Sequence, residues 1–415
     1  MMTKTLRAVF IFLLFSTSVL AQSTKDRYIP ERVILNLTEK PSSSVAVTWR
    51  TVTESAKQGV EFAEATDGVQ FEKIKKMTPA KREHLEADKS RTVFHYSVVL
   101  GDLKPGVKYV YRVGGDSVWS EWNQFTTARA SAAPFKFVWF GDPQDDINEH
   151  VSRVFREAYK TAPGANFWLF SGDLTSEPVD TQIGELFSAA GFIWRMVPSV
   201  MTPGNHDLGF RMEQGVIARN ARGQKERTKS VSALWRSHFT LPENGIVSLE
   251  ETSYSFDFQG VRIIMVNSND KLQEQAAWME KLLSENPNTW TIVSFHHPLY
   301  SCGRERDGRE TRNAFLSIFD RYNVDLVLTG HDHAYTRSKK LKNGVVVGEN
   351  EKGTVYMVSS SGPEFYVANP LYQSLMAKTA VDKSLFQVVS VDGNRLSLKA
   401  YSAAGLLFDS FELVK

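Results

Sequence analysis

The sequence is short of cysteine, of net charge and, beyond its first residues, of long apolar runs. It has 415 residues and one cysteine, Cys302, so an intramolecular disulfide is excluded. The formal net charge is only +2, which gives no indication of a nucleic-acid partner. With 42% hydrophobic and 23% charged residues, the composition is that of an ordinary globular protein. A chain of this length predicts two or three cores rather than one.

The first 21 residues have the pattern of a secretory signal peptide. Lys4 and Arg7 precede an apolar run over residues 8–15, and residues 19–21 (Val-Leu-Ala) are typical of a cleavage site. The alternative is a membrane anchor, but the apolar run is short for a membrane span. We therefore expect a secreted or periplasmic protein with no membrane span once residues 1–21 are removed. Export without disulfides is more typical of a bacterial envelope than of a eukaryotic secretory route.

The pattern of the mature chain changes once, at a linker of small residues over 128–134. Residues 28–128 predict an all-β sandwich, because short alternating segments are separated by turns. Residues 134–415 alternate apolar strand runs with helical patterns, which predicts an α/β domain with a largely parallel sheet. From about residue 353 the β pattern dominates again. The polar, Arg-rich residues 210–229 have no clear periodicity and are expected to form a surface loop.

Five short motifs in the second domain carry polar residues, and all but one directly end an apolar strand. The exception follows the short apolar run over residues 198–201. In open α/β sheets the carboxyl ends of the strands face the ligand crevice, and glycine lets the backbone turn sharply there. The motifs are, in order, Gly141-Asp-Pro-Gln144, Gly172-Asp173, Gly204-Asn-His-Asp207, His296-His-Pro298 and Gly330-His-Asp-His333.

One edge of the predicted sheet would therefore gather a dense set of possible metal ligands. The chain has only nine histidines, and five of them lie in three of these motifs. Imidazole together with carboxylate and amide oxygen is the ligand set of Zn, Mn and Fe, and a carboxylate such as Asp173 can bridge two ions. Each motif alone is weak, but their conjunction predicts a metal site. The gathered residues are Asp142, Asp173, Asn205, His206, His296, His331 and His333.

These motifs resemble the calcineurin-like metallophosphoesterases and, within them, the purple acid phosphatases. Residues 330–337 (Gly-His-Asp-His-Ala-Tyr-Thr-Arg) are similar to the last ligand motif of the family, and residues 103–114 resemble its N-terminal module. The resemblance covers nearly the whole mature chain. It implies an α/β metallophosphoesterase β-sandwich flanked by helices, preceded by an all-β fibronectin type III-like domain.

The resemblance also implies a role for each site residue. Asp142 and His333 would hold the first metal ion, and Asp173 would bridge to the second. His206 would lie near the leaving group as a catalytic residue. Asp207 would orient His206 or, as we slightly prefer, cap the following segment. The second metal ion would be held by Asn205, His296 and His331.

The sequence departs from the purple acid phosphatase pattern at two positions. Ser176 stands where these enzymes have a tyrosine whose phenolate favours Fe(III), so we expect two divalent ions, Zn, Mn or Fe, and not Fe(III) at the first site. Gln144 stands where other metallophosphoesterases often have a histidine ligand. Its amide oxygen could bind the first metal ion, contact phosphate or be structural. His297 is a further candidate, although it could equally be an ordinary loop residue.

The expected function is the dinuclear metal-dependent hydrolysis of a small phosphorylated substrate. An activated hydroxide would attack phosphorus, and His206 would protonate the leaving group. A phosphomonoesterase is the leading hypothesis. The alternatives are a phosphodiesterase of the same superfamily and a non-catalytic envelope binding protein. Near the site, Cys302 is expected to serve packing, and the arginines at 304, 306, 309 and 312 are expected to form a solvated loop rather than to meet phosphate.

Overall fold

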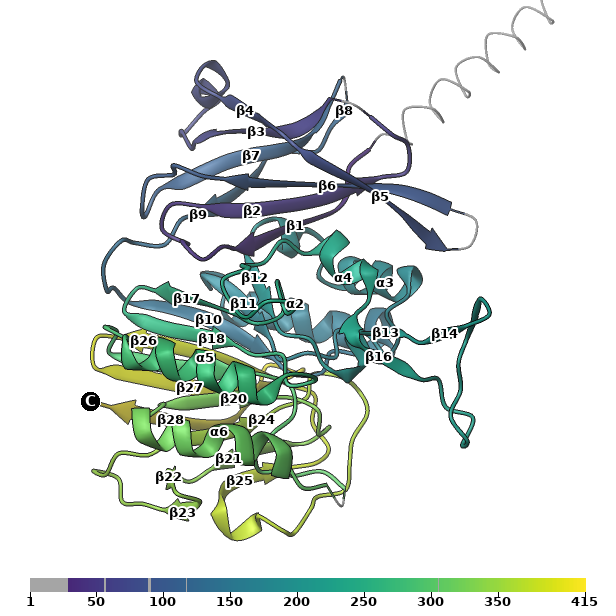
Figure 1. The fold of residues 1–415 in the computed structure, drawn as a ribbon. Helices are drawn as coiled ribbons and strands as arrows, with labels where there is room; N and C mark the ends of the chain where they lie inside the picture. The colour runs from purple at the N-terminus through teal and green to yellow at the C-terminus, as the bar shows by residue number, and fades with distance from the viewer. Residues whose placement is uncertain (1–28, 56, 89–90, 117, 305) are drawn as a thin grey trace, which may run out of the picture.

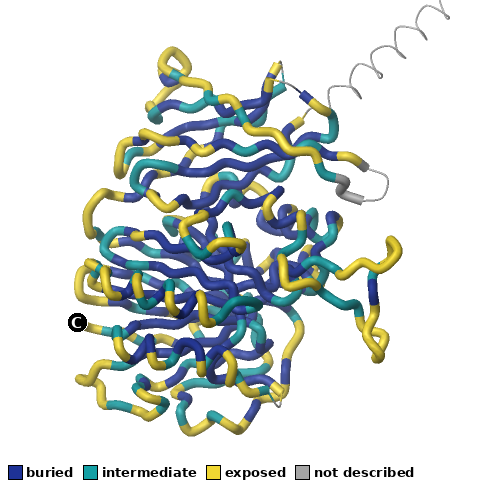
Figure 2. The backbone as a smooth tube through the Cα atoms, viewed as in Figure 1, coloured by how far each residue is buried: buried dark blue, intermediate teal, exposed yellow. Residues whose placement is uncertain are grey.

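The computed structural model describes residues 29–415 except residues 56, 89–90, 117 and 305. The predicted signal peptide lies outside these residues. The all-β domain forms the upper part of Figure 1 and the α/β domain forms the lower part. Buried backbone runs through the strands of both parts, and exposed backbone is concentrated in helices and connecting loops (Figure 2). None of the helices in the described part of the chain combines the length and the apolar character that a membrane span requires.

The N-terminal domain is a sandwich of two sheets. Its core is built from inward-facing aromatic residues: Trp49 stacks on Tyr96 with ring centroids 5.7 Å apart, and Tyr109 stacks on Phe125 at 5.7 Å. One sheet contains β1 (Glu31–Leu37), β2 (Val45–Thr51), β6 (Arg91–Leu100) and β5 (Lys81–Asp88). The other contains β4 (Lys76–Pro79), β3 (Gln58–Glu64), β7 (Lys108–Gly115), β8 (Val118–Trp119) and β9 (Asn123–Thr126).

The second domain contains strands of two large sheets with helices outside them, as the predicted fold class requires. The first sheet contains β10 (Phe135–Phe140), β11 (Phe167–Phe170), β12 (Ser199–Met201), β26 (Leu385–Asp392), β27 (Arg395–Ser402) and β28 (Leu407–Val414). The second contains β17 (Tyr254–Phe258), β18 (Val261–Met265), β19 (Trp290–Ser294), β20 (Leu326–Thr329), β24 (Val355–Val358), β21 (Tyr335–Ser338) and β25 (Met376–Ala380). The helices are α2 (Ser152–Thr161), α3 (Asp180–Ala190), α4 (Ala233–His238), α5 (Leu272–Ser284) and α6 (Arg309–Tyr322).

The sheets are mixed rather than largely parallel, so that part of the prediction is wrong. Strands β10, β11 and β12 are parallel, as are β18, β19, β20 and β24, because helices connect most of them. The three C-terminal strands are antiparallel, because short turns such as the one at Gly393 join them as hairpins. The parallel strands are the ones whose carboxyl ends carry the five motifs.

One sheet crosses from the first domain into the second. Strand β1 pairs in parallel with β12 at Asn36 and Ser199, which makes a single sheet of ten strands. The fully buried Asn36 side chain secures this junction: its Nδ2 donates to the Ser199 carbonyl at 3.0 Å, and its Oδ1 accepts from the Thr240 amide at 3.1 Å. The sheet is therefore continuous although the linker over residues 128–134 separates the two sequence patterns.

The expectation of a loop over residues 210–229 is wrong. Strand β13 (Leu208–Phe210) pairs with β16 (Arg227–Val231), and β14 (Met212–Glu213) pairs with β15 (Val216–Ile217). Gln214 and Gly215, with φ of 48° and 81°, form the tight turn between β14 and β15. The resulting hairpin projects from the body of the molecule (Figure 1). It has no apolar periodicity because backbone pairing, not a buried face, holds most of it.

A buried cluster of charged and imidazole groups joins the two domains. Arg32 and Arg50 of the first domain both donate to Asp180 of α3, at 2.7 and 2.6 Å. Arg32 also donates to Nε2 of His238 at 3.0 Å. The His238 ring packs edge-on against the His95 ring, with the ring centroids 4.6 Å apart. Burial, together with the neighbouring Arg50, lowers the pKa of His95 to about 4. Both imidazoles are therefore neutral in the folded protein at ordinary pH.

The neutral His95 predicts a loss of stability in acid. Above pH 6.5 the imidazole is neutral in both the folded and the unfolded chain. Between pH 6.5 and about 4 only the unfolded chain takes up the proton, so up to about 3 kcal/mol of folding free energy is lost over this window. His95→Gln should reduce the difference in melting temperature between pH 7.5 and pH 5.0. The exposed His150→Gln is the control, and equal pH differences in the two variants would contradict the assignment.

Candidate metal centre

The predicted ligands meet because parallel strands of both sheets end at the same place. Asp142 follows β10, Asp173 follows β11 and His296 follows β19. The glycines of the motifs permit the close approach. A Cβ at Gly330 would lie 2.0 Å from Asp142 Oδ1, and a Cβ at Gly204 would lie 2.1 Å from Asp173 Oδ1. Any larger residue at either position would displace a carboxylate.

Four donor groups converge at the proposed second metal position. His296 Nε2 lies 3.1 Å from Asp173 Oδ2, 3.2 Å from Asn205 Oδ1 and 3.2 Å from His331 Nδ1. His296 is fully buried, and its other ring nitrogen lies 2.9 Å from the Ser171 carbonyl. That contact makes Nδ1 the protonated nitrogen and leaves the lone pair of Nε2 facing the other donors. This is the complete ligand set that the resemblance implies for the second ion.

The proposed first metal position lies beside Asp142. His333 Nε2 is 3.3 Å from Asp142 Oδ2 and 3.1 Å from the Gln144 side-chain nitrogen. Gln144 and His333 are both buried; His333 Nδ1 lies 2.9 Å from Glu364 Oε2, whereas Gln144 Oε1 has no hydrogen-bond partner among the described residues. A buried polar atom without a partner is costly, so an unpaired amide oxygen beside a buried carboxylate fits the binding of a cation.

The electrostatics of the centre also fit a cationic occupant. Burial raises the pKa of Asp142. Burial also acts to raise the pKa of Asp173, but the attraction of His296 outweighs it and holds this pKa well below its usual range. Burial lowers the pKa of His296, while Asp173 and Asp142 raise it, to about 9 in all. Two buried carboxylates within reach of one imidazole thus need positive charge, which divalent ions would supply.

Comparison with known proteins agrees with this geometry. The family model of the calcineurin-like phosphoesterases matches residues 135–335, and that of the purple acid phosphatase N-terminal domain matches residues 30–127. The chain belongs to the calcineurin-like metallophosphoesterases of the purple acid phosphatase type. It is accordingly a hydrolase of phosphate esters that depends on a dinuclear metal centre.

Individual relatives are distant in sequence. Phosphoenolpyruvate phosphatase of Allium cepa is 25% identical over 357 residues, which cover 83% of this chain and 69% of that protein. Purple acid phosphatase 21 of Arabidopsis thaliana is 26% identical over 339 residues, which cover 77% of this chain and 69% of that protein. The structure of purple acid phosphatase PPD1 from yellow lupin superimposes with a TM-score of 0.77 at 20% identity, covering 93% of this chain and 74% of that one. The structure of PhoD superimposes with a TM-score of 0.63 at 11% identity, and the match covers 93% of this chain and 90% of that one.

Ser176, which stands where the purple acid phosphatases have their metal-binding tyrosine, binds a neighbouring carboxylate instead. The Ser176 hydroxyl accepts a hydrogen bond from the Asp145 amide at 3.1 Å and donates to the Asp145 carboxylate. Asp145, which the sequence did not single out, has a ligand atom within 4.8 Å of ligand atoms of His333 and Glu364. Ser176 therefore anchors a carboxylate near the first metal position and has no free hydroxyl proton to offer.

His206 and Asp207 have separate surroundings. His206 Nδ1 donates to the Ser176 carbonyl at 2.7 Å, and its backbone amide donates to Asp173 Oδ1 at 2.7 Å. Asp207 contacts no ring atom of His206. Its carboxylate accepts from the Leu174 amide at 3.1 Å and from the Gly204 amide at 2.8 Å, so it caps the turn. Burial, followed by repulsion from Asp173, raises the pKa of Asp207 to about 7.

Two arginines at the site were not recognised from the sequence. Arg227, in the segment expected to be a solvent-facing loop, donates to the His206 carbonyl at 2.8 Å and to the Ser176 carbonyl at 3.0 Å. Arg306, in the other arginine-rich segment, donates to the His331 carbonyl at 2.9 Å. Of the other three arginines there, Arg304 and Arg309 are exposed as expected, whereas Arg312 is half-buried. Cys302 is buried, in keeping with a packing role.

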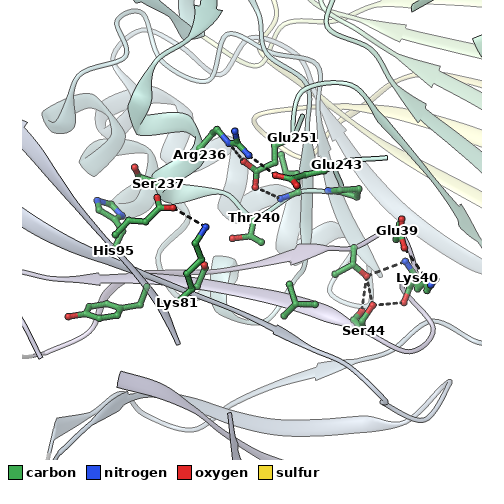
Figure 3. Close-up of a pocket in the computed structure, with 17 residues that line it drawn as sticks. Glu39, Lys40, Ser44, Lys81, His95, Arg236, Ser237, Thr240, Glu243 and Glu251 are labelled. Atoms are coloured by element: carbon green, nitrogen blue, oxygen red, sulfur yellow. Dashed lines mark hydrogen bonds and ion pairs between the residues drawn. The ribbon is translucent and has the colours of Figure 1, made fainter. Parts of the chain in front are cut away.

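One sizeable cavity of the described part of the chain lies away from the metal centre. It has a volume of about 730 Å³ and lies between the two domains, with His95, Lys81, Arg236 and Glu251 in its wall (Figure 3). Its charged groups are paired with one another: Arg236 binds Glu251 at 2.7 Å and also Glu243. A second cavity of about 600 Å³ adjoins His331 and His297. The second cavity is the one next to the reactive centre.

The capping role of Asp207 predicts a combined loss of stability and of metal. Asp207→Ala leaves two buried amides without their acceptor, at a cost of about 1–3 kcal/mol each, and loosens the turn that presents Asn205. We expect a lower melting temperature and weaker binding of one of two metal ions, measured by elemental analysis after dialysis. The exposed Asp382→Ala is the control. Full metal content, with activity lost selectively on poor leaving groups, would instead assign Asp207 to orienting His206.

Proposed function

We propose that this chain is an exported phosphomonoesterase with a divalent ion, Zn, Mn or Fe, at each of two sites. One observation carries the proposal: Asp173, Asn205 and His331 all have a ligand atom within 3.2 Å of His296 Nε2, while Asp142 and His333 adjoin them. Export is supported by the signal-like pattern of residues 1–21. The names of the relatives, which include a phosphoenolpyruvate phosphatase, support small monoesters as substrates.

In this proposal Asp142, His333 and the Gln144 amide oxygen hold the first ion, and Asn205, His296 and His331 hold the second. Asp173 would bridge them, because its carboxylate faces His296 and its ligand atom also lies within 4.8 Å of that of Asp142. The bound ions would polarise the phosphate and supply a hydroxide nucleophile near neutral pH.

His206 is proposed to act on the leaving group. Its Nδ1 is held by the Ser176 carbonyl, so Nε2 is the nitrogen that can carry a proton to the departing oxygen. Arg227 donates to the Ser176 carbonyl that holds Nδ1 and to the backbone carbonyl of His206, and it is proposed as the positioning residue of this ring. The phosphodiesterase alternative predicts faster turnover of a diester than of the matched monoester. The non-catalytic alternative predicts no turnover at all.

The bridging role of Asp173 gives a direct test. Asp173→Asn removes the negative charge that two cations would share, so we expect loss of at least one ion and a fall in kcat of more than a hundredfold. Elemental analysis and turnover of an aryl phosphate measure the two effects. Phosphatase activity that survives with both ions bound would exclude the bridging role.

The proposed role of His206 predicts a dependence on the leaving group. His206→Ala should lower kcat by roughly 10²–10⁴ for an alkyl phosphate, whose leaving oxygen needs a proton. The loss should be much smaller for p-nitrophenyl phosphate, whose leaving group departs as an anion. The comparison of the two substrates in the same variant is its own control. Equal losses on both would argue against proton donation by His206.

The ligand set also predicts the optical properties of the protein. A centre without a phenolate ligand has no phenolate-to-iron charge-transfer transition, so protein purified without added metal should be colourless. Elemental analysis should find two divalent ions per chain. A purple protein, or one stoichiometric Fe(III), would contradict the proposed metal identity while leaving the hydrolase function intact.

A further inference from the structure

The cavity beside His331 has the features of a leaving-group subsite. It has a volume of about 600 Å³, and its wall includes Ser268, His297, Arg306 and the metal-site residue His331. The inference drawn from it rests on the proposed function, because a phosphate held at the metal centre would direct its ester group into a neighbouring space. The cavity is large enough for a small organic group.

The orientation of His297 is fixed by Ser268. The Ser268 hydroxyl oxygen accepts a hydrogen bond from the His297 amide at 3.0 Å and lies 2.8 Å from His297 Nδ1. In the tautomer that keeps a proton on Nε2, the hydroxyl proton, which has no other acceptor among the described residues, is donated to Nδ1. The ring of this tautomer is neutral and presents Nε2–H as a donor. This N–H is free of protein partners in the described part of the chain.

The ring of His297 lies close to the second metal position. A ligand atom of its ring is within 4.8 Å of ligand atoms of both His296 and His331, and its ring centroid is 4.4 Å from that of His331. An N–H donor at this distance can reach an oxygen of a phosphate ester that is held at the metal centre.

Arg306 also contacts His331. Its Nη1 donates to the His331 carbonyl at 2.9 Å and lies 3.2 Å from Asp332 Oδ1. These two contacts anchor the guanidinium, while Nη2 and Nε have no hydrogen-bond partner among the residues described. The side chain is 31% exposed and borders the cavity. An anchored guanidinium with free donors is suited to binding a carboxylate or a phosphate.

The remaining charges of the wall favour an anion over a cation. Asp307 is neutralised, because Arg312 donates to it at 2.8 Å and Arg309 lies 3.5 Å away. Glu310 and Lys229 also line the cavity, and both are exposed. Their charges are of opposite sign. Arg306 shares its Nη1 with Asp332, but its Nη2 and Nε are without hydrogen-bond partners among the described residues, so it is the cation of the wall whose donors an incoming ligand can use.

We propose that this cavity binds the leaving group of the substrate, with His297 Nε2–H and Arg306 as its donors, and that it selects phosphomonoesters whose leaving group carries an anionic substituent. His297 then serves as a substrate-binding residue and not as a metal ligand. Arg306 is the specificity-determining residue, because only an anionic leaving group uses its free donors fully.

A matched pair of substrates tests the selectivity. 2-Phosphoglycerate and glycerol 2-phosphate differ only in a carboxylate in place of a hydroxymethyl group. The metal-replete wild-type protein should show a kcat/KM roughly tenfold or more higher for 2-phosphoglycerate. Arg306→Gln should reduce that ratio about tenfold, mainly through KM, and Arg306→Lys should restore part of it. Arg321→Gln, an exposed arginine on α6 outside the cavity, should leave the ratio unchanged.

His297 is tested by metal content together with KM. His297→Ala should keep two ions per chain by elemental analysis and raise KM for both substrates roughly tenfold. His297→Gln, which retains an N–H donor, should recover part of the loss. Loss of an ion from His297→Ala would make the residue a ligand and overturn its assignment.

The outcomes separate this inference from the function on which it rests. Turnover of both phosphomonoesters with equal kcat/KM, or an equal loss on both in Arg306→Gln, would overturn the anionic subsite and leave the phosphomonoesterase standing. Metal loss from Arg306→Gln would assign that residue to holding His331 and would also overturn the subsite. Absence of any phosphomonoester turnover by the metal-replete wild-type protein would refute the proposed function itself.

Discussion

The structure depends on two buried carboxylates, Asp142 and Asp173, that lie against the same imidazole, His296. Burying like charges together is unfavourable unless positive charge compensates them. The ends of several strands converge here and bring imidazole nitrogens and an amide oxygen, which can bind cations, next to the two carboxylates. The backbone is left-handed at three residues of the site, with φ of 35° at Asp142, 50° at Asp173 and 70° at His331. This conformation is strained for residues other than glycine, and here it accompanies the placement of the ligands. Dinuclear metal chemistry follows from this arrangement.

The parts of the site that the sequence predicts are those whose position is set locally. Asp142 and Asp173 each follow an apolar strand directly, so the end of a parallel strand places them without knowledge of distant contacts. Arg306 and Arg227 could not be found in this way. They reach the site through contacts to the backbone carbonyls of His331 and His206, and a carbonyl leaves no signature in the sequence. Asp145 was missed for a related reason, because its role depends on Ser176, 31 residues away.

The predictable parts of the fold are likewise those that depend on local sequence. The N-terminal sandwich and the alternation of strands and helices in the second domain follow from periodicity and from the family motifs. The continuation of one sheet across both domains does not, because a single parallel bridge between Asn36 and Ser199, 163 residues apart, creates it. The hairpin over residues 208–231 was invisible because its short polar strands bury no face, and burial is what produces periodicity.

The shared sheet suggests why an all-β domain accompanies the catalytic one. Strand β12 leads directly into the turn that presents Asn205, and β1 of the first domain covers the edge of that strand. Without β1, the edge of β12 would lie open and the Asn36 contacts to Ser199 and Thr240 would be lost. The ion pairs of Arg32 and Arg50 with Asp180 fasten the same junction. The N-terminal domain therefore acts on the metal centre mechanically, as the outer support of a ligand-bearing strand, and needs no ligand of its own to matter for catalysis.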